Sequence, residues 1–123
     1  MSVRRIEVQT NPPYGVHVGP SALEGVREAC LQEREGFVLA DEKAWSLHGK
    51  ALVGLEAAPR LEIAGGEGAK SLAQLEGVLD ALAASGLSRA SAVITFGGGS
   101  ISDLGGLAAS IFKRGIDVVH CPT

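Results

Sequence analysis

The sequence has few aromatic residues, little excess charge and no long apolar run. Phe, Trp and Tyr make up 4% of the chain, too few for the stacking platforms that bind single-stranded nucleic acids. A net charge of −3 lacks the basic excess of a DNA- or RNA-binding surface. No stretch approaches the roughly 18 apolar residues of a membrane-spanning helix, and the opening segment MSVRRIEVQTNPP lacks the apolar core of a signal peptide. We therefore expect a cytoplasmic protein with no nucleic-acid or membrane partner.

Cysteine and histidine are also scarce. Cys30 and Cys121 are far apart in apolar surroundings, which predicts reduced core thiols, because neither has a local pattern that would activate a catalytic thiol. His17, His48 and His120 share no metal-ligand spacing with each other or with the cysteines. We expect no metal site in this chain, and we expect His120, within an apolar segment, to be a core residue.

Glycine, by contrast, is abundant. The chain contains 17 glycines among 123 residues, about twice the average usage. They lie between apolar runs, which indicates tight turns rather than a low-complexity segment. Hydrophobic residues make up 46% and charged residues 20%, an ordinary globular composition, and the length suits one domain with its own core.

Strand-length apolar segments alternate with amphipathic segments along the chain. Around the proline turn NPPYG, Ile6 and Val8 alternate with polar residues, as do Val16 and Val18, which predicts a hairpin at the edge of a sheet. Buried strands are expected at residues 36–41, from residue 61, and at residues 92–96 and 116–122.

Four helices are expected between these strands. Ser21 with Glu24, and Ser71 with Gln74, form capping boxes that predict helices over residues 21–35 and from 71 to 86. Residues 42–55 and 100–112 are the other two, although glycines at 49 and 54 disfavour the former. The predicted apolar faces are Leu23, Val26, Ala29 and Cys30 in the first helix, and Leu72, Leu75, Val78, Leu79 and Leu82 in the third. The alternation predicts an α/β fold, with an open, mostly parallel sheet, helices on both faces and an N-terminal hairpin.

Three polar loops follow predicted strands. Asp41 ends one strand, GGEGAK follows a second and GGGSISD follows a third. Ligands of open α/β sheets bind outside the carboxyl ends of the strands. At GGGS the missing side chains would let a phosphate approach the backbone at a helix N-terminus. A tight turn whose glycines only permit close packing is an equal alternative, because the spacing matches neither a Walker loop nor a complete Rossmann fingerprint.

Each polar candidate has a structural alternative. Asp41 is suited to hold ribose hydroxyls or simply to cap a helix, and Asp103 is suited to a ligand or to a cap shared with Ser100. For Glu67 and Lys70 the alternative to a ligand role is an ion pair with each other, which contributes little to stability if it is exposed. Arg114 is a candidate anion binder or a solvated charge at a helix C-terminus.

The segments GGEGAKSL, GGGSISDLGGLAAS and RGIDVVHCPT together resemble 3-dehydroquinate synthases. Members of that family carry G-E-x-x-K-S, then G-G-G-x-x-x-D-L-x-G-F-x-A, then R-G followed by a strand ending in P-T-T. All three blocks occur here in order. The predicted hairpin, the strand ending at Asp41 and the helix after Ser71 also fit the family, so the resemblance covers nearly the whole chain. It implies a Rossmann-like fold in which residues 1–123 form the NAD-binding domain.

The resemblance also implies residue roles. Asp41 matches the carboxylate that holds the adenine-side ribose, and Asp103 matches the aspartate near the nicotinamide ribose. The remaining cofactor-binding positions are Glu67, Lys70, Gly98, Gly99, Ser100 and Thr123, of which the two glycines match those against the diphosphate. Arg114 matches an arginine that helps to bind the anionic substrate, either in its own subunit or in the neighbouring subunit of a homodimer.

The family reaction converts 3-deoxy-D-arabino-heptulosonate 7-phosphate to 3-dehydroquinate and phosphate in the shikimate pathway. It uses NAD and a divalent metal, zinc or cobalt, whose ligands and the other catalytic residues lie beyond P-T-T in the family. We therefore expect no catalytic or metal-binding residue in this chain, and no turnover by it alone. The chain departs from the family pattern at four positions. It has Lys43 where the family has Asn, Ser100 and Ser102 where the family has Val and Gly, and Leu107 where the family has Phe. Four alternatives to a 3-dehydroquinate synthase remain. Two are enzymes: a related cyclase such as 2-deoxy-scyllo-inosose synthase, and a polyol dehydrogenase. The other two are a non-catalytic nucleotide-binding module and a domain without a ligand.

Overall fold

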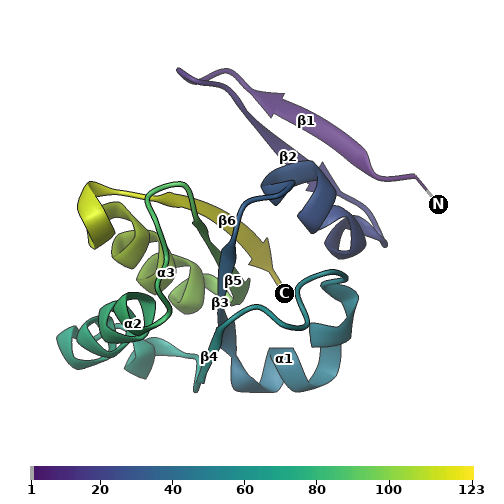
Figure 1. Cartoon of the computed structure of the whole chain (residues 1–123). Helices are drawn as coiled ribbons and strands as arrows, with labels where there is room; N and C mark the ends of the chain where they lie inside the picture. The colour runs from purple at the N-terminus through teal and green to yellow at the C-terminus, as the bar shows by residue number, and fades with distance from the viewer. Residues whose placement is uncertain (1) are drawn as a thin grey trace.

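A computed structural model describes residues 2–123 and shows a four-stranded sheet beside a separate two-stranded hairpin (Figure 1). The strand order of the larger sheet is β4-β3-β5-β6, and every neighbouring pair is parallel. The strands are β1 (Arg4–Val8), β2 (Tyr14–Val18), β3 (Gly36–Asp41), β4 (Arg60–Ile63), β5 (Ala92–Gly97) and β6 (Asp117–Pro122). The predicted fold class, a parallel sheet with helices and an N-terminal hairpin, is confirmed.

Helices cover both faces of the larger sheet. Helices α2 (Leu72–Ala84) and α3 (Gly99–Ile111) lie on one side, and α1 (Glu42–His48) lies on the other (Figure 1). Along β3, Phe37 and Leu39 belong to the core under α2 and α3, whereas Val38 and Ala40 belong to the core under α1. Because both faces are buried, β3 and β5 are apolar throughout rather than alternating, as parallel strands require.

Two of the predicted helices agree closely with the structure. The hydroxyl of Ser71 accepts a hydrogen bond from the Gln74 N–H at 3.1 Å and begins α2. Gly86, with φ of 68°, follows its end. Val78 and Leu82 of the predicted apolar face are buried, but Leu72 is 85% exposed because it lies in the first turn, beyond the edge of the core.

The other two predicted helices differ. Residues 22–25 form a 3-10 helix and Arg27–Leu31 a π-helix, and within the described chain the Ser21 side chain makes no cap hydrogen bond. Of the predicted apolar face, Val26 is buried and Leu23 and Cys30 pack against the core, but the wider π turn buries Leu31 and leaves Ala29 exposed, so the prediction was wrong at Ala29. Helix α1 stops at His48, where the chain tightens into a 3-10 turn, so the predicted extent to residue 55 was too long.

Two strand expectations also need correction. The hairpin is not an edge of the main sheet; β1 and β2 pair only with each other among the described strands. Strand β6 is an edge strand with several exposed residues rather than a buried one. His120 is therefore an exposed residue, not a core residue, and its Nδ1 lies 2.7 Å from the hydroxyl oxygen of buried Thr95.

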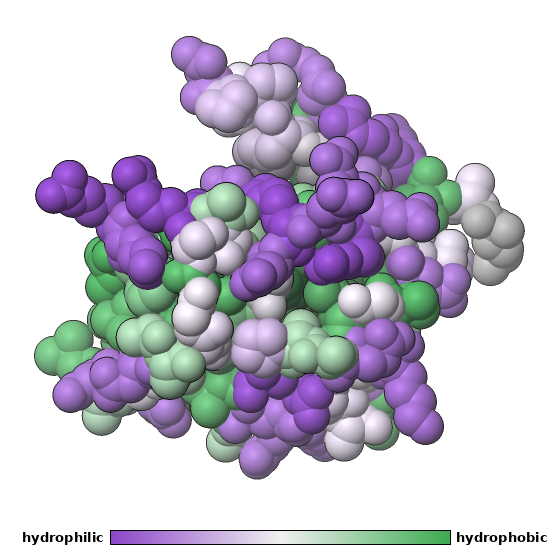
Figure 2. Space-filling model, in the orientation of Figure 1, coloured by the Kyte–Doolittle hydropathy of each residue, from purple (hydrophilic) through white to green (hydrophobic). Residues whose placement is uncertain are grey.

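The surface carries scattered apolar side chains. Hydrophobic atoms show most clearly on the side of the body where α2 and α3 lie (Figure 2), and exposed Leu107 and Ile111 belong to α3. Across residues 2–123, no helix has both the length and the apolar character needed to cross a bilayer.

Close packing of α3 on the sheet depends on Gly105. A Cβ at this position would overlap Cγ2 of Thr95, a β-branched residue fixed within β5. We expect Gly105→Ala to lower the free energy of unfolding by about 1–3 kcal/mol, because the helix must move off the sheet. Urea unfolding of the purified chain measures this effect.

Gly77→Ala is the matched control, because Gly77 is an exposed residue within α2 whose added Cβ would contact nothing in the described chain. That substitution should raise the free energy of unfolding by about 0.5–1 kcal/mol. Equal stabilisation by both substitutions would contradict the close contact between α3 and β5.

Candidate functional site

The carboxyl edge of the parallel sheet gathers all eight of the predicted cofactor-binding residues. The register places Asp41 beside Ile63, and Gly97 beside Pro122, so the loops that follow β3, β4, β5 and β6 emerge together. Between them these loops and the start of α3 carry Asp41, Glu67, Lys70, Gly98, Gly99, Ser100, Asp103 and Thr123.

Asp41 holds two neighbouring segments at this edge. Its Oδ2 accepts a hydrogen bond from the Ala44 N–H at 2.9 Å and so caps α1. Its Oδ1 accepts another from the Gly65 N–H at 2.8 Å in the loop after β4. The predicted capping role is therefore present. Because a carboxylate offers about four acceptor positions, two of them remain for a ligand hydroxyl.

The loop after β4 is also joined to α3. The Gly66 N–H donates to the hydroxyl oxygen of Ser100 at 3.1 Å. Gly66 has φ of 90°, a conformation that favours glycine, and the next residues turn in a 3-10 helix, Glu67–Ala69. Ser100 thus fixes where this loop lies relative to the first turn of the helix, and its O–H remains able to donate to another acceptor.

Lys70 forms an ion-pair bridge between the same two segments. Its Nζ lies 3.0 Å from Oδ2 of Asp103 in α3 and 3.7 Å from Oε1 of Glu67. The hydrogen bond to Asp103, followed by the charge of Glu67, raises the pKa of the Lys70 ammonium above its ordinary value. These side chains are exposed, so the pairs contribute little to stability. Their effect is to place a fixed cation beside the start of α3.

Gly98 and Gly99 distinguish the two interpretations of the GGGS loop. A Cβ at either position would meet no atom of the described chain within 4 Å, and neither residue has a positive φ. Close packing therefore does not explain these two glycines. It does explain Gly97, which has φ of 154° and whose added Cβ would lie 3.0 Å from both Asp41 and Ile101.

The open positions cluster at this edge. Only five glycines of the described chain have neither a positive φ nor a neighbour within 4 Å of an added Cβ, and three of them are Gly68, Gly98 and Gly99. The other two, Gly25 and Gly77, lie elsewhere. The first backbone N–H groups of α3, a helix of 13 residues, project into the same region. Accessible backbone N–H groups, a positive helix end and a nearby lysine suit an anionic group such as a diphosphate.

Thr123 joins this group, whereas Arg114 does not. The Thr123 N–H donates to the Gly97 carbonyl at 3.1 Å, which places the end of β6 beside the glycine loop. Arg114 is exposed in the turn after α3, with φ of 67°, so it lies at the opposite end of that helix from Gly98. Within one chain, Arg114 and the glycine loop do not form a common site.

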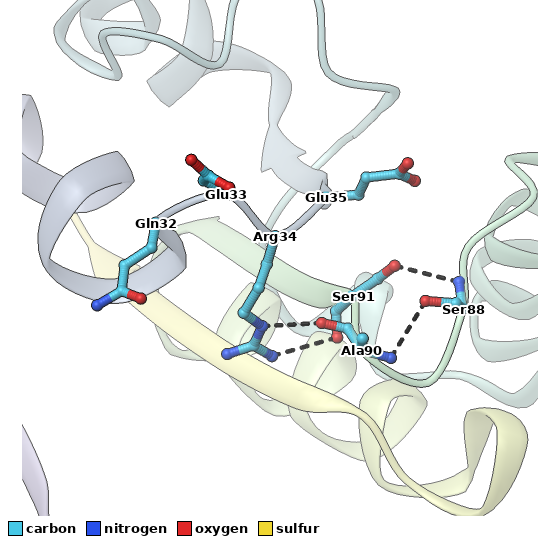
Figure 3. A pocket seen from close by; sticks show the side chains of 7 residues that line it. All are labelled: Gln32, Glu33, Arg34, Glu35, Ser88, Ala90 and Ser91. Atoms are coloured by element: carbon cyan, nitrogen blue, oxygen red, sulfur yellow. Dashed lines mark hydrogen bonds between the residues drawn. The ribbon is translucent and has the colours of Figure 1, made fainter.

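A hollow lies at the other edge of the sheet (Figure 3). It has a volume of about 640 Å³ and precedes β3 and β5, and it is lined by Gln32, Glu33, Arg34, Glu35, Ser88, Ala90 and Ser91. The guanidinium of Arg34 is already used, because it donates to the carbonyls of Ala90 and Ser91 and pairs with Asp117 at 2.9 Å. The hollow lies between the loops that precede β3 and β5, at the amino ends of the strands. Ligands of such sheets usually bind at the carboxyl ends instead.

Neither cysteine has the surroundings of a nucleophile. Both are free thiols. Desolvation by burial, reinforced by Cys30, raises the pKa of Cys121 to about 12, and burial also raises the pKa of Cys30. Both shifts lower the thiolate fraction at neutral pH. Among residues 2–123, no group of three or more His, Cys, Asp or Glu side chains is arranged to hold a metal ion.

The sequence did not reveal the hydrogen bonds that assemble the edge. The sequence predicts a turn at Gly65 and Gly66 and, through the family resemblance, a cofactor-binding position at Ser100, but it indicates no contact between that turn and Asp41 or Ser100. Their backbone and hydroxyl contacts join residues 24 and 34 positions apart, a pairing that no local pattern encodes. The sequence feature that points to these hydrogen bonds is the pair of glycines, Gly65 and Gly66, directly before Glu67.

Comparison with known proteins places these features in a family. A family model described as 3-dehydroquinate synthase N-terminal matches residues 60–123. The 3-dehydroquinate synthase of Campylobacter jejuni subsp. doylei is 44% identical over 90 residues, which is 71% of this chain and 26% of that protein. The enzyme of Mycolicibacterium vanbaalenii is 32% identical over 124 residues, 96% of this chain and 34% of that protein. The chain thus spans about a third or less of the length of these relatives.

Solved structures of sugar-phosphate cyclases share the fold. A 2-deoxy-scyllo-inosose synthase complexed with carbaglucose-6-phosphate, NAD+ and Co2+ has a TM-score of 0.79 and 24% identity, over 99% of this chain and 35% of that one. ValA, a 2-epi-5-epi-valiolone synthase from Streptomyces hygroscopicus with NAD+ and Zn2+ bound, has a TM-score of 0.61 and 32% identity, over 72% of this chain and 26% of that one. On the match of the family model, which covers more than half of the residues, this chain belongs to the 3-dehydroquinate synthase family.

Proposed function

We propose that residues 1–123 are the NAD-binding domain of a 3-dehydroquinate synthase, and that Gly98 and Gly99 receive the diphosphate of NAD. The observation that carries this proposal is the pair of glycines whose missing side chains nothing in the described chain explains. They lie at the N-terminus of α3, beside Lys70 and between the ends of β5 and β6. Membership of the family and NAD+ in two solved relatives of the same fold support the choice of cofactor.

The chain's own side chains would bind and orient the dinucleotide. Asp41 accepts from ribose hydroxyls on the adenine side, and Asp103 does the same near the nicotinamide ribose. The ammonium of Lys70 and the first N–H groups of α3 neutralise the diphosphate, with Glu67 and Ser100 holding the loop in place. Thr123 completes the edge after β6. When bound, NAD supplies a reversible hydride acceptor for the substrate.

The full reaction requires groups outside these residues. The proposed activity is conversion of 3-deoxy-D-arabino-heptulosonate 7-phosphate to 3-dehydroquinate with loss of phosphate. The family uses a divalent metal, but within the described chain no cluster of side chains is arranged to bind one. We therefore propose no metal-binding role for these residues. Arg114, remote from the glycine loop in its own chain, would meet the anionic substrate in a neighbouring subunit of a cytoplasmic homodimer.

A related sugar-phosphate cyclase is the second candidate. The 2-deoxy-scyllo-inosose synthase matches the fold over nearly the whole chain, and its complex with carbaglucose-6-phosphate supports a different phosphosugar as the substrate in this second candidate. Higher identity to 3-dehydroquinate synthases favours the first candidate.

Substitution of Gly98 tests the diphosphate site. Gly98 has φ of −79° and ψ of −169°, which any residue can adopt, so Gly98→Ala should change the free energy of unfolding by less than about 0.5 kcal/mol. Its new Cβ would occupy the approach of the diphosphate, and we expect the dissociation constant for NAD to rise about tenfold or more. Isothermal titration calorimetry with NAD measures the constant.

Gly77→Ala is again the control, because it adds the same methyl group on α2 away from the carboxyl edge. NAD affinity should be unchanged in this variant. Wild-type affinity in Gly98→Ala would contradict the proposed position of the diphosphate.

Asp103 tests the ribose side. Asp103→Ala removes a hydrogen-bond acceptor for NAD, and we expect about a tenfold loss of affinity. Asp80→Ala, at an exposed position of α2, should leave affinity unchanged. Separately from NAD, the pKa of Lys70 should fall toward its ordinary 10.5 in Asp103→Ala, because the hydrogen bond to the Asp103 carboxylate, which does most to raise it, is lost. Heteronuclear NMR of the Lys70 side chain measures that shift, and unchanged NAD affinity would count against the role of Asp103.

Activity is tested on the protein as its gene encodes it. Release of phosphate from 3-deoxy-D-arabino-heptulosonate 7-phosphate, dependent on NAD and on Zn2+ or Co2+, is the expected result. Glucose 6-phosphate in place of that substrate tests the second candidate. A protein that binds NAD but processes neither substrate would be a nucleotide-binding module, and the enzymatic part of the proposal would fail.

A further inference from the structure

A side-chain hydrogen bond links the two strands that end beside the glycine loop. His120 of β6 lies directly opposite Thr95 of β5 in the parallel register. Its Nδ1 is 2.7 Å from the Thr95 hydroxyl oxygen, which is a short hydrogen bond. Thr95 precedes Gly97 by two residues and His120 precedes Thr123 by three, so the pair lies just inside the carboxyl edge.

Buried Thr95 depends on exposed His120 for its hydrogen bond. Thr95 is 0% exposed, and within residues 2–123 its hydroxyl makes this one hydrogen bond. Loss of the imidazole would leave the buried hydroxyl without a partner, which is unfavourable. His120, by contrast, is an exposed residue of an edge strand. A surface side chain is therefore tied to the core at this point.

The pair also lies against helix α3. A Cβ at Gly105 would overlap Cγ2 of Thr95, and a Cβ at Gly106 would lie 3.5 Å from Cε1 of the His120 ring. Two consecutive glycines therefore bring α3 close to both side chains. The first N–H groups of this same helix form the proposed diphosphate site. The hydrogen-bonded pair thus contacts the helix that carries the site, and it joins the two strands beneath that helix.

The carboxyl end of β6 has few other attachments. Among the described strands β6 pairs only with β5. Two side chains of β6 make hydrogen bonds within the described chain: Asp117 with Arg34 at the amino end, and His120 with Thr95. Beyond His120, the Thr123 N–H donates to the Gly97 carbonyl at 3.1 Å. Strand ends held this sparsely open locally at low cost in free energy, so the His120 hydrogen bond matters for where Thr123 lies.

We propose that His120 is a positioning residue of the NAD site. Its hydrogen bond to Thr95 fixes the carboxyl end of β6 against β5 and α3, and so holds Thr123 beside Gly97 and the glycine loop. This inference rests on the proposed function, because it assigns an effect on NAD binding to a residue that acts through Thr123.

A purely stabilising hydrogen bond would behave differently from a positioning one. If the pair only stabilised the fold, its loss would change the fraction of folded molecules but not the NAD affinity of those that are folded. A positioning role changes the dissociation constant of the folded protein itself. Affinity measured well below the unfolding temperature therefore separates the two roles.

Two substitutions of the same shape isolate the hydrogen bond. Asn carries a polar atom at the position of Nδ1, whereas Leu has the same branched skeleton with no polar atom. We expect His120→Leu to raise the dissociation constant for NAD about three- to tenfold, and His120→Asn to stay within about twofold of the wild type. Isothermal titration calorimetry on the protein as its gene encodes it measures both constants.

Thr95→Val removes the other partner and keeps the Cγ2 that contacts α3, so it should weaken NAD binding as His120→Leu does. If the two side chains act as one unit, the double variant T95V/H120L should bind NAD about as weakly as either single variant, rather than with the product of the two losses. Multiplied losses would contradict the pairing.

Ser110→Ala is the matched control. The Ser110 hydroxyl is exposed near the end of α3 remote from the glycine loop, and it donates to the Leu107 carbonyl of its own helix. This variant removes a hydrogen bond of similar length without touching β6. Its affinity for NAD should equal that of the wild type.

Hydrogen exchange tests the placement of β6 without any cofactor. Peptides that cover residues 116–123 should exchange faster in His120→Leu than in the wild type, and at the wild-type rate in His120→Asn. Mass spectrometry of the quenched protein measures these rates. Unchanged exchange in His120→Leu would overturn the inference.

The outcomes distinguish this inference from the proposed function. Wild-type NAD affinity in His120→Leu, with weakened binding in Gly98→Ala, would overturn the role of His120 and leave the NAD site in place. Weakened binding in His120→Leu but not in Gly98→Ala would support the role of His120 and contradict the proposed position of the diphosphate. A wild-type protein that binds no NAD would overturn both.

Discussion

The carboxylate of Asp41 joins segments on which the carboxyl edge of the sheet depends. One oxygen caps α1 and the other holds the loop after β4, while Gly97 packs against the same side chain. Ser100 and Lys70 then attach that loop to α3 through Gly66 and Asp103. The loops after three adjacent strands are thus placed by contacts among themselves, and a ligand bound there would meet a preformed surface.

Glycine serves two different purposes in this fold. Gly105 lets α3 lie directly on Thr95, and Gly97 allows the turn from β5 into the helix. Gly98 and Gly99 serve neither purpose, since neither the backbone conformation nor the described neighbours require them. The first two determine where the helix lies, and the second two determine what can approach its N-terminus. This division is the physical basis for assigning a diphosphate to the loop.

The hairpin differs from the α/β body in how much of its apolar surface is buried. Within the described residues the body buries both faces of its sheet and leaves scattered apolar side chains exposed on α2 and α3. The hairpin exposes apolar side chains, and β1 pairs only with β2 among the described strands.

The alternation of apolar strands and amphipathic helices, and the three motif blocks, were enough to determine the fold class, the family and the polar candidates at strand ends. Local patterns failed where tertiary packing overrode them: at Arg27–Leu31, where a π turn buries Leu31, at exposed Leu72, and at His120 on an edge strand. Tertiary structure alone decided that Arg114 lies away from the glycine loop and that Ser100 holds Gly66. Periodicity reports which side of an element is apolar, but contacts between residues far apart in sequence depend on how the elements meet in space.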